Sequence, residues 1–92
     1  MPDTFLYITL GTNDLARAIR FYDAALAPLG LQRRATEADE AGYARPDDHR
    51  CRFWITRPFD GMAATVGNGS MPAFDAPDRK AVDAFHTAAC AA

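Results

Sequence analysis

The sequence offers few side chains that could act as nucleophiles or metal ligands. It contains two histidines and two cysteines among 92 residues. His49 lies in a polar turn, and His86 follows Phe85 on an expected helix, so we interpret both as solvated or packed side chains rather than ligands. Cys51 and Cys90 stand in no CxxC pair or other metal-ligand spacing, which predicts two reduced thiols. The sequence therefore shows no catalytic group.

Cys51 has arginines on both sides, Arg50 and Arg52. Nearby positive charge can lower the pKa of a thiol and make it reactive. Successive residues of a strand point to opposite faces, however, so these guanidinium groups are expected to lie away from the thiol. We predict that Cys51 is unreactive.

The first expected elements are a strand and an amphipathic helix. Residues 5–10 are rich in aromatic and β-branched side chains, which is typical of a strand. Thr12 or Asn13 is expected to cap the helix that follows, with Asp14 in its first turn, where a carboxylate is favourable. The apolar residues of the helix recur at three- and four-residue steps, namely Leu15, Ala18, Ile19, Tyr22, Ala25, Leu26 and Leu29.

Three more strands are expected after this helix, at residues 31–36, 42–45 and 50–56. The last one alternates Arg50, Arg52, Trp54 and Thr56 on one face with Cys51, Phe53 and Ile55 on the other. Helices on one face of such a sheet form an α+β arrangement.

A faint internal repeat relates the two ends of the chain at a constant offset of about 64 positions. It aligns Asp14 with Asp78, Phe21 with Phe85 and Leu10 with Phe74. The second copy predicts a strand at residues 71–75 and a helix that has Pro77 in its first turn. The chain then stops inside this helix, which indicates one complete module and the beginning of another.

These residues resemble the vicinal oxygen chelate superfamily, which includes glyoxalase I, extradiol dioxygenases and bleomycin and fosfomycin resistance proteins. The resemblance rests on the following stretches: Asn13-Asp14-Leu15, Phe21-Tyr22, Leu29-Gly30-Leu31, residues 67–74 and residues 81–86. It implies an α+β fold of paired βαβββ modules, with the second module incomplete in this chain. On this reading residues 1–92 form a single domain, with residues 1–61 as the first module, 62–70 as a connector and 71–92 as the start of the second.

The resemblance also implies where a divalent metal would be held. A His or Gln is expected on the first strand of each module, where this sequence has Tyr7 and Met71. A Glu is expected on the last strand of the first module, where residues 52–54 are Arg, Phe and Trp. These side chains are poor ligands for a hard divalent cation. We therefore expect no metal and no other cofactor, unless ligands come from a further segment or a partner chain.

The same resemblance predicts a ligand-binding cavity lined by one face of each strand. If Tyr7 faces this cavity, Thr9 does so too, and Met71 and Asp75 face it from the second copy. On the strand at residues 50–56, Arg52 and Trp54 are assigned to the cavity, although the opposite assignment stays open. The predicted ligand-binding residues are Tyr7, Thr9, Tyr43, Arg52, Trp54, Met71 and Asp75. The aromatic side chains suit stacking on a flat small molecule, with Arg52 placing an anionic group.

Three functions remain open at this point. The favoured one is a metal-independent small-molecule-binding protein. The alternatives are a glyoxalase-type lyase or dioxygenase, whose metal ligands come from the missing segment or a partner chain, and a degenerate fragment without activity. Whether the chain is an enzyme is left undecided.

Charge and hydropathy limit the classes of binding partner and the cellular location that we expect for this protein. The formal net charge of −2 and the lack of a Lys or Arg run argue against nucleic acid. No apolar stretch is long enough to cross a bilayer and no signal peptide is evident, so we expect a cytoplasmic protein without membrane contact. An unfinished module exposes a strand edge and a helix face, which predicts a homodimer.

Overall fold

The protein is described here by a computed structural model, which places residues 4–92. The order of elements is β1 (Ile8–Gly11), α1 (Leu15–Leu26), a 3-10 helix η1 (Ala27–Leu29), β2 (Gln32–Thr36), β3 (Glu40–Ala44), β4 (Phe53–Thr56) and α2 (Arg79–Ala91). The first three residues of the predicted first module lie outside the described residues. The α+β prediction is confirmed.

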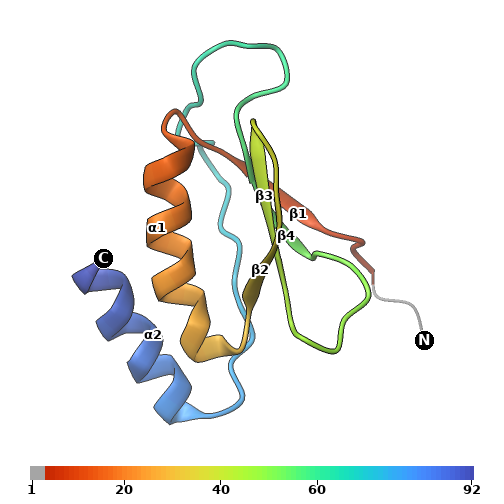
Figure 1. Ribbon diagram of the computed structural model, residues 1–92. Helices are drawn as coiled ribbons and strands as arrows, with labels where there is room; N and C mark the ends of the chain where they lie inside the picture. The colour runs from red at the N-terminus through yellow and green to blue at the C-terminus, as the bar shows by residue number, and fades with distance from the viewer. Residues whose placement is uncertain (1–3) are drawn as a thin grey trace.

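The four strands form one sheet in the order β1-β4-β3-β2. β1 runs parallel to β4, whereas β2–β3 and β3–β4 are antiparallel neighbours. Both helices lie on one side of the sheet, α1 against it and α2 on the outer side of α1 (Figure 1). No helix formed by residues 4–92 covers the other side of the sheet (Figure 1).

Both helices begin at an aspartate, and the two aspartates are the ones that the repeat aligns. The Asp14 side chain accepts a hydrogen bond from the backbone N–H of Arg17 at 3.0 Å, and that of Asp78 accepts one from Ala81 at 2.8 Å. Each carboxylate satisfies a backbone donor that has no partner inside its helix. The prediction of Thr12 or Asn13 as the cap is therefore wrong, because the cap lies one or two residues later.

Helix α1 ends at Leu26, and the 3-10 helix η1 continues the turn, so the predicted close at Pro28 and Gly30 belongs to η1 and not to α1 itself. Pro28 lies within η1, and Gly30 adopts a left-handed φ of 82° while its N–H donates to the carbonyl of Ala27. A residue with a Cβ adopts this conformation only at a cost, so glycine suits the position.

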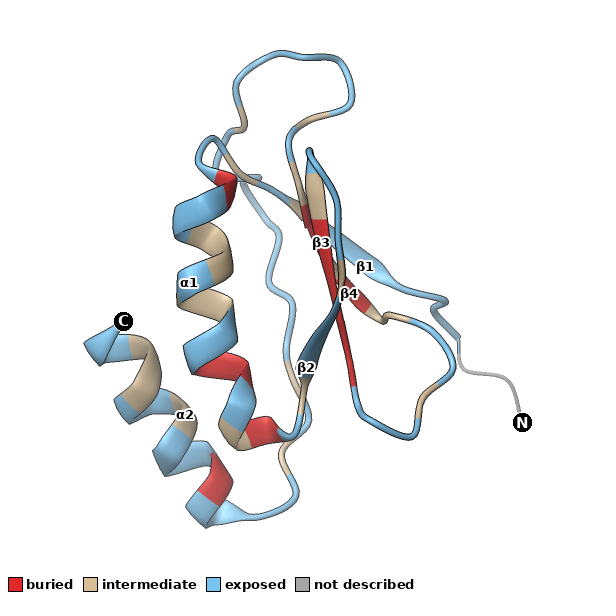
Figure 2. Cartoon of the chain, in the orientation of Figure 1, coloured by how far each residue is buried: buried red, intermediate tan, exposed pale blue. Residues whose placement is uncertain are grey.

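The hydrophobic core lies between α1 and the sheet. Its most buried residues are on β3, β4 and the two ends of α1, whereas β1 is largely exposed (Figure 2). Leu10 and Phe74, which the repeat aligns, both pack against this core, and the Phe74 ring lies 5.1 Å from that of Phe53. The repeat thus relates positions that share an environment.

The strand predicted at residues 71–75 does not form. Residues 57–78 join β4 to α2 without a helix or strand. A strand exists only through its ladder partners, and the β-prone residues of this segment have no neighbouring strand with which to pair. The predicted boundaries at residues 61 and 70 remain a prediction.

Candidate functional site

The candidate site is the side of the sheet that faces away from α1, which we call the open face. Phe53 and Ile55 of β4 are buried on the helix side, so Trp54 between them and Thr56 after them point to the open face. The register places Thr9 beside Trp54. Trp54 therefore lies on the open side of the sheet, and its role in binding a ligand stays a prediction.

Tyr7 stands next to Trp54 at the start of β1. Their ring centroids lie 6.5 Å apart at an interplanar angle of 69°, an edge-to-face arrangement. Such a pair is favourable because the positive edge of one ring meets the negative face of the other. Tyr7 is 52% exposed and Trp54 half-buried, so the pair offers aromatic surface to solvent.

Gly42 of β3 makes room for the Trp54 ring. A Cβ at this position would lie 2.9 Å from Cε3 of Trp54 and 2.9 Å from both Cβ and Sγ of Cys51. Cys51 therefore lies on the open face with Trp54, and its predicted place on the opposite face is wrong. The reason is that β4 begins only at Phe53, so the strand alternation does not extend back to residue 51.

Burial raises the pKa of the Cys51 thiol, and the charge of nearby Asp48 adds to this rise, whereas Arg34 opposes it. A thiol with a raised pKa is a poor nucleophile at neutral pH. This agrees with the prediction that Cys51 is unreactive.

Arg52 is engaged by its own chain. Its Nε donates to Oδ2 of Asp48 at 2.8 Å, its Nη2 lies 3.3 Å from Oδ1 of the same carboxylate, and its Nη1 donates to the carbonyl of Leu6 at 3.2 Å. These contacts tie the β3–β4 loop to the chain that leads into β1. We therefore assign Arg52 a structural contact in place of the predicted anion-binding role.

The Arg52 guanidinium, together with a backbone N–H from Arg50, lowers the pKa of Asp48 to about 2. Because the folded pKa is below the ordinary value near 3.8, the ion pair stabilises the fold at pH above about 4 and is lost as the pH falls to about 2.

Asp48→Asn should lower the melting temperature at pH 7, and the difference from the parent should shrink as the pH approaches 2. Thermal melts followed by circular dichroism would measure this. The neighbouring change Asp47→Asn is the control, and an equal difference at pH 2 and pH 7 would contradict the prediction.

Tyr43 is not on the open face. Its side chain is fully buried on the helix side, and its hydroxyl donates to Oδ1 of Asp23 at 2.8 Å. The prediction that Tyr43 lines the cavity is wrong because β3 pairs Tyr43 with Phe53, whose side chain points to the helices.

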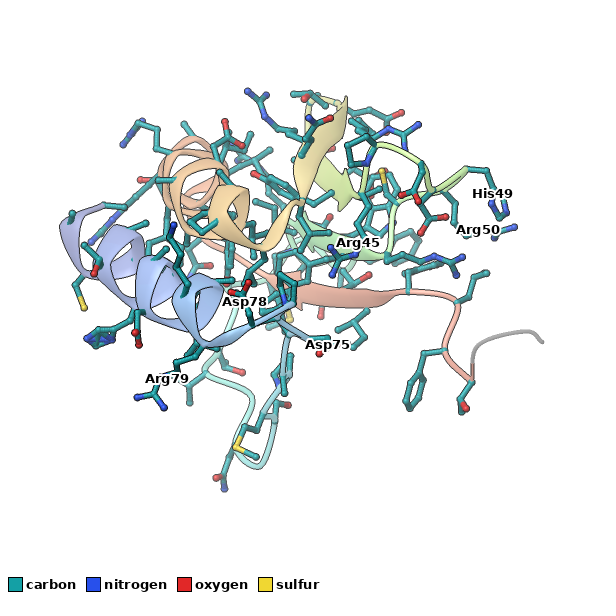
Figure 3. All side chains as sticks on the ribbon, turned by 90° about the horizontal axis from the view of Figure 1, so that it is seen from below. Arg45, His49, Arg50, Asp75, Asp78 and Arg79 are labelled. Carbon is teal, nitrogen blue, oxygen red and sulfur yellow. The ribbon has the colours of Figure 1, made fainter. Side chains whose placement is uncertain are left out.

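Met71 and Asp75 lie on the segment between β4 and α2, and both are exposed. Figure 3 shows Asp75 just before α2, whereas His49 and Arg50 project from the outer end of the β3–β4 loop. Within residues 4–92, no hydrogen bond, ion pair or ring contact joins Met71 or Asp75 to the Tyr7–Trp54 pair. The structure thus brings together Tyr7, Thr9, Trp54 and Arg52, and leaves the other three predicted residues elsewhere.

The sequence interpretation missed a hollow at the far end of the open face. It measures about 730 Å³ and is lined by residues of the β1–α1 corner, of β3 and β4 and of the following loop: Thr12, Asn13, Asp39, Glu40, Thr56, Arg57, Pro58, Phe59, Gly61, Met62 and Ala63. The Asn13 side chain holds this loop, because its Nδ2 donates to the carbonyl of Ala64 at 3.1 Å and its Oδ1 accepts from the Ala64 N–H at 2.6 Å. Thr56, which lines the hollow, lies two residues beyond Trp54 on the same face, so β4 contributes to both the hollow and the aromatic surface.

The side chains of the open face do not fit a metal. Within residues 4–92 no three His, Cys, Asp or Glu side chains gather closely enough to hold an ion. The positions at which the resemblance placed ligands carry a phenol at Tyr7 and a thioether at Met71, which suit hard divalent cations poorly. We therefore assign no metal-dependent chemistry to the open face.

The similarity of this chain to a known protein identifies its family. No family model and no curated protein matches the sequence. A solved structure does: a glyoxalase/bleomycin resistance protein from Albidiferax ferrireducens T118 is similar to this chain with 36% sequence identity and a TM-score of 0.84. The match covers 97% of this chain and 72% of the other. This chain belongs to the glyoxalase/bleomycin resistance protein family. The glyoxalase-like fold implied by the sequence is thereby confirmed.

Family membership fixes the fold and leaves the activity open, because related scaffolds host many chemistries. Among residues 4–92, no helix combines the length and the apolar character that a bilayer crossing needs. The expected cytoplasmic location and the homodimer remain predictions.

Proposed function

We propose that this member of the glyoxalase/bleomycin resistance protein family binds a flat aromatic small molecule on its open face, without a metal. The observation that carries the proposal is the Tyr7–Trp54 pair, which presents edge-to-face rings 6.5 Å apart on a side of the sheet that no helix covers. Binding sites for small molecules typically combine such aromatic walls with a few polar groups.

Two further observations support this function. Gly42 leaves space for the Trp54 ring, and the hollow beside Thr56 extends the surface with polar groups such as Asn13 and Glu40. Because the Arg52 guanidinium is engaged by Asp48 and Leu6, we expect stacking, rather than pairing with an anion, to dominate affinity.

Trp54 is the only tryptophan of the chain, so its fluorescence reports on the open face directly. We would titrate metal-free bleomycin, from which the family takes part of its name, and follow Trp54 emission in the presence of EDTA. Saturable quenching is expected, and Tyr7→Ala should weaken binding by about fivefold, because one aromatic stacking partner contributes roughly 1 kcal/mol. Val66→Ala is the control, since Val66 is almost fully exposed on the segment after β4 and does not line the hollow.

If Tyr7→Ala leaves the quenching unchanged and Phe59→Ala abolishes it, the ligand binds in the hollow and not at the Tyr7–Trp54 pair. Affinity that appears only after a divalent metal is added would overturn metal independence. Absence of saturation with bleomycin and with a panel of neutral planar aromatics would overturn the binding function itself.

A further inference from the structure

A second group of chemically capable side chains lies on α2, away from the open face. Arg79, Asp83, His86 and Cys90 follow one another at steps of four, three and four residues, which places them on one stripe of the helix. The buried residue Ala81 and the half-buried Phe85 and Ala88 lie on the opposite side, toward α1. Arg79 and Asp83 are 87% and 67% exposed, and Figure 3 shows Arg79 projecting into solvent. The stripe therefore faces outward.

Cys90 and His86 are adjacent on this stripe. Sγ of Cys90 lies 3.7 Å from Nε2 of His86, and both side chains are exposed. A thiolate and an imidazole bound to one tetrahedral Zn²⁺ ion, with bonds of about 2.3 Å and 2.0–2.1 Å, are separated by about 3.6 Å. The two donor atoms thus already have the spacing that a shared ion requires.

The chemistry of the pair selects the class of ion. Thiolate and imidazole together favour borderline-soft cations such as Zn²⁺ over Mg²⁺ or Ca²⁺. Asp83 and Arg79 lie one and two helical turns before His86 and form an ion pair at 3.2 Å. Their charges cancel, so this part of the stripe does not repel a cation. On binding, the Cys90 thiol releases its proton to solvent and His86 ligates through unprotonated Nε2.

One chain supplies only half of a closed zinc site. Structural Zn²⁺ sites have four protein ligands, and within residues 4–92 no third His, Cys, Asp or Glu joins the pair. A second copy that presents the same outward stripe across a two-fold axis would supply the other Cys and His. We propose that Cys90 and His86 form a half-site, and that two copies of this chain bind one Zn²⁺-class ion between their α2 helices through two cysteines and two histidines.

The Cys90–His86 half-site is separate from the ligand-binding site proposed on the open face. α2 packs on the outer side of α1, and the sheet lies beyond α1 (Figure 1). The ion would hold two copies together and would take no part in binding at Tyr7 and Trp54.

The chain provides a matched control for each ligand, since it contains exactly one other cysteine and one other histidine. We would titrate the reduced protein with Zn²⁺ in a phosphine reductant, and measure mass by sedimentation and affinity by calorimetry. One ion per two chains, a dimer, and reversal by EDTA are expected. Cys90→Ser or His86→Ala should weaken binding by at least about 100-fold, because even indirect partners of metal ligands contribute 10–100-fold. Cys51→Ser and His49→Ala should leave it unchanged.

Co²⁺ in place of Zn²⁺ gives a second readout. A near-ultraviolet thiolate-to-cobalt band with intense visible bands is expected, because a tetrahedral thiolate site produces both, and Cys90→Ser should remove the near-ultraviolet band. A monomer that binds one ion per chain would overturn the shared site. Binding that survives both Cys90→Ser and His86→Ala, or no binding at micromolar Zn²⁺, would overturn the half-site.

Discussion

Tyr43→Ala is expected to destabilise the protein by about 3–5 kcal/mol, the usual cost of removing a large buried aromatic side chain. The Tyr43 ring is fully buried and lies 6.3 Å from Tyr22 and 6.1 Å from Phe53. Small domains are stable by only about 5–15 kcal/mol, so this change removes much of the total. Urea denaturation followed by circular dichroism would measure the loss.

Tyr43→Phe separates the ring from its hydroxyl. It keeps the packing and removes the hydrogen bond to Asp23, whose carboxylate still pairs with Arg33 at 3.1 Å. We expect a loss of about 1 kcal/mol, as for one hydrogen bond. Phe59→Ala, at a fully exposed ring, should change stability little, and a Tyr43→Ala protein as stable as Phe59→Ala would contradict the assignment of Tyr43 to the core.

Burial, together with the Asp23 carboxylate, raises the pKa of Tyr43. The neutral phenol is therefore favoured in the fold, and this contribution is complete below about pH 10 and lost as the pH rises beyond the ordinary tyrosine value. The parent should consequently lose more stability above pH 10 than Tyr43→Phe does.

Gly42→Ala is expected to cost about 1–3 kcal/mol, although it adds only one methyl group, because overpacking a filled space forces its neighbours apart. The new Cβ would meet Cys51 and Trp54 at 2.9 Å. Cys51 is short and Trp54 is rigid, so neither can move aside without disturbing the open face.

The change should also shift the emission of Trp54 and weaken ligand binding, which a loss of stability alone would not do in the folded protein. Cys51→Gly in the same chain should recover part of the stability, because it removes two of the three crowded atoms. Gly61→Ala is the control for the emission: its φ of 76° strains the backbone, so this change should also lower stability, but a Cβ there meets nothing within 4 Å and the Trp54 emission should stay parental. A Gly42→Ala protein with parental stability and parental emission would contradict this picture.

The helices could be predicted from the sequence because their signals are local. These signals are the two aligned aspartates Asp14 and Asp78, the apolar stripes and Gly30. Each depends only on residues a few positions away, and each appears in the structure near its expected place. The cap was misplaced by one or two residues because Thr12, Asn13 and Asp14 are all competent caps, and the choice depends on which side chain reaches the free N–H of Arg17.

The site was harder to predict because it depends on strand register. Trp54 was assigned correctly, since buried residues flank it on β4. Tyr43 was assigned wrongly because its neighbours Gly42 and Ala44 are small and give no sign of the buried face; only pairing with Phe53 decides it. The strand at residues 71–75 was expected from the internal repeat, which says nothing about whether a partner strand is present. The spacing of His86 and Cys90 was visible, yet its meaning depends on which side of α2 faces outward.

The parallel pairing of β1 with β4 has a consequence for the order of folding. β2, β3 and β4 are joined by a short turn and by the loop at residues 45–52 and can pair early, whereas Ile8 must wait for Phe53, which lies 45 positions away. Contacts between residues far apart in the sequence form late, because the intervening chain must first be ordered. During synthesis the first strand therefore leaves the ribosome long before its partner exists. Until β4 has been made, the apolar residues Phe5, Leu6 and Tyr7, which directly precede β1, have no paired strand beside them and are open to chaperones.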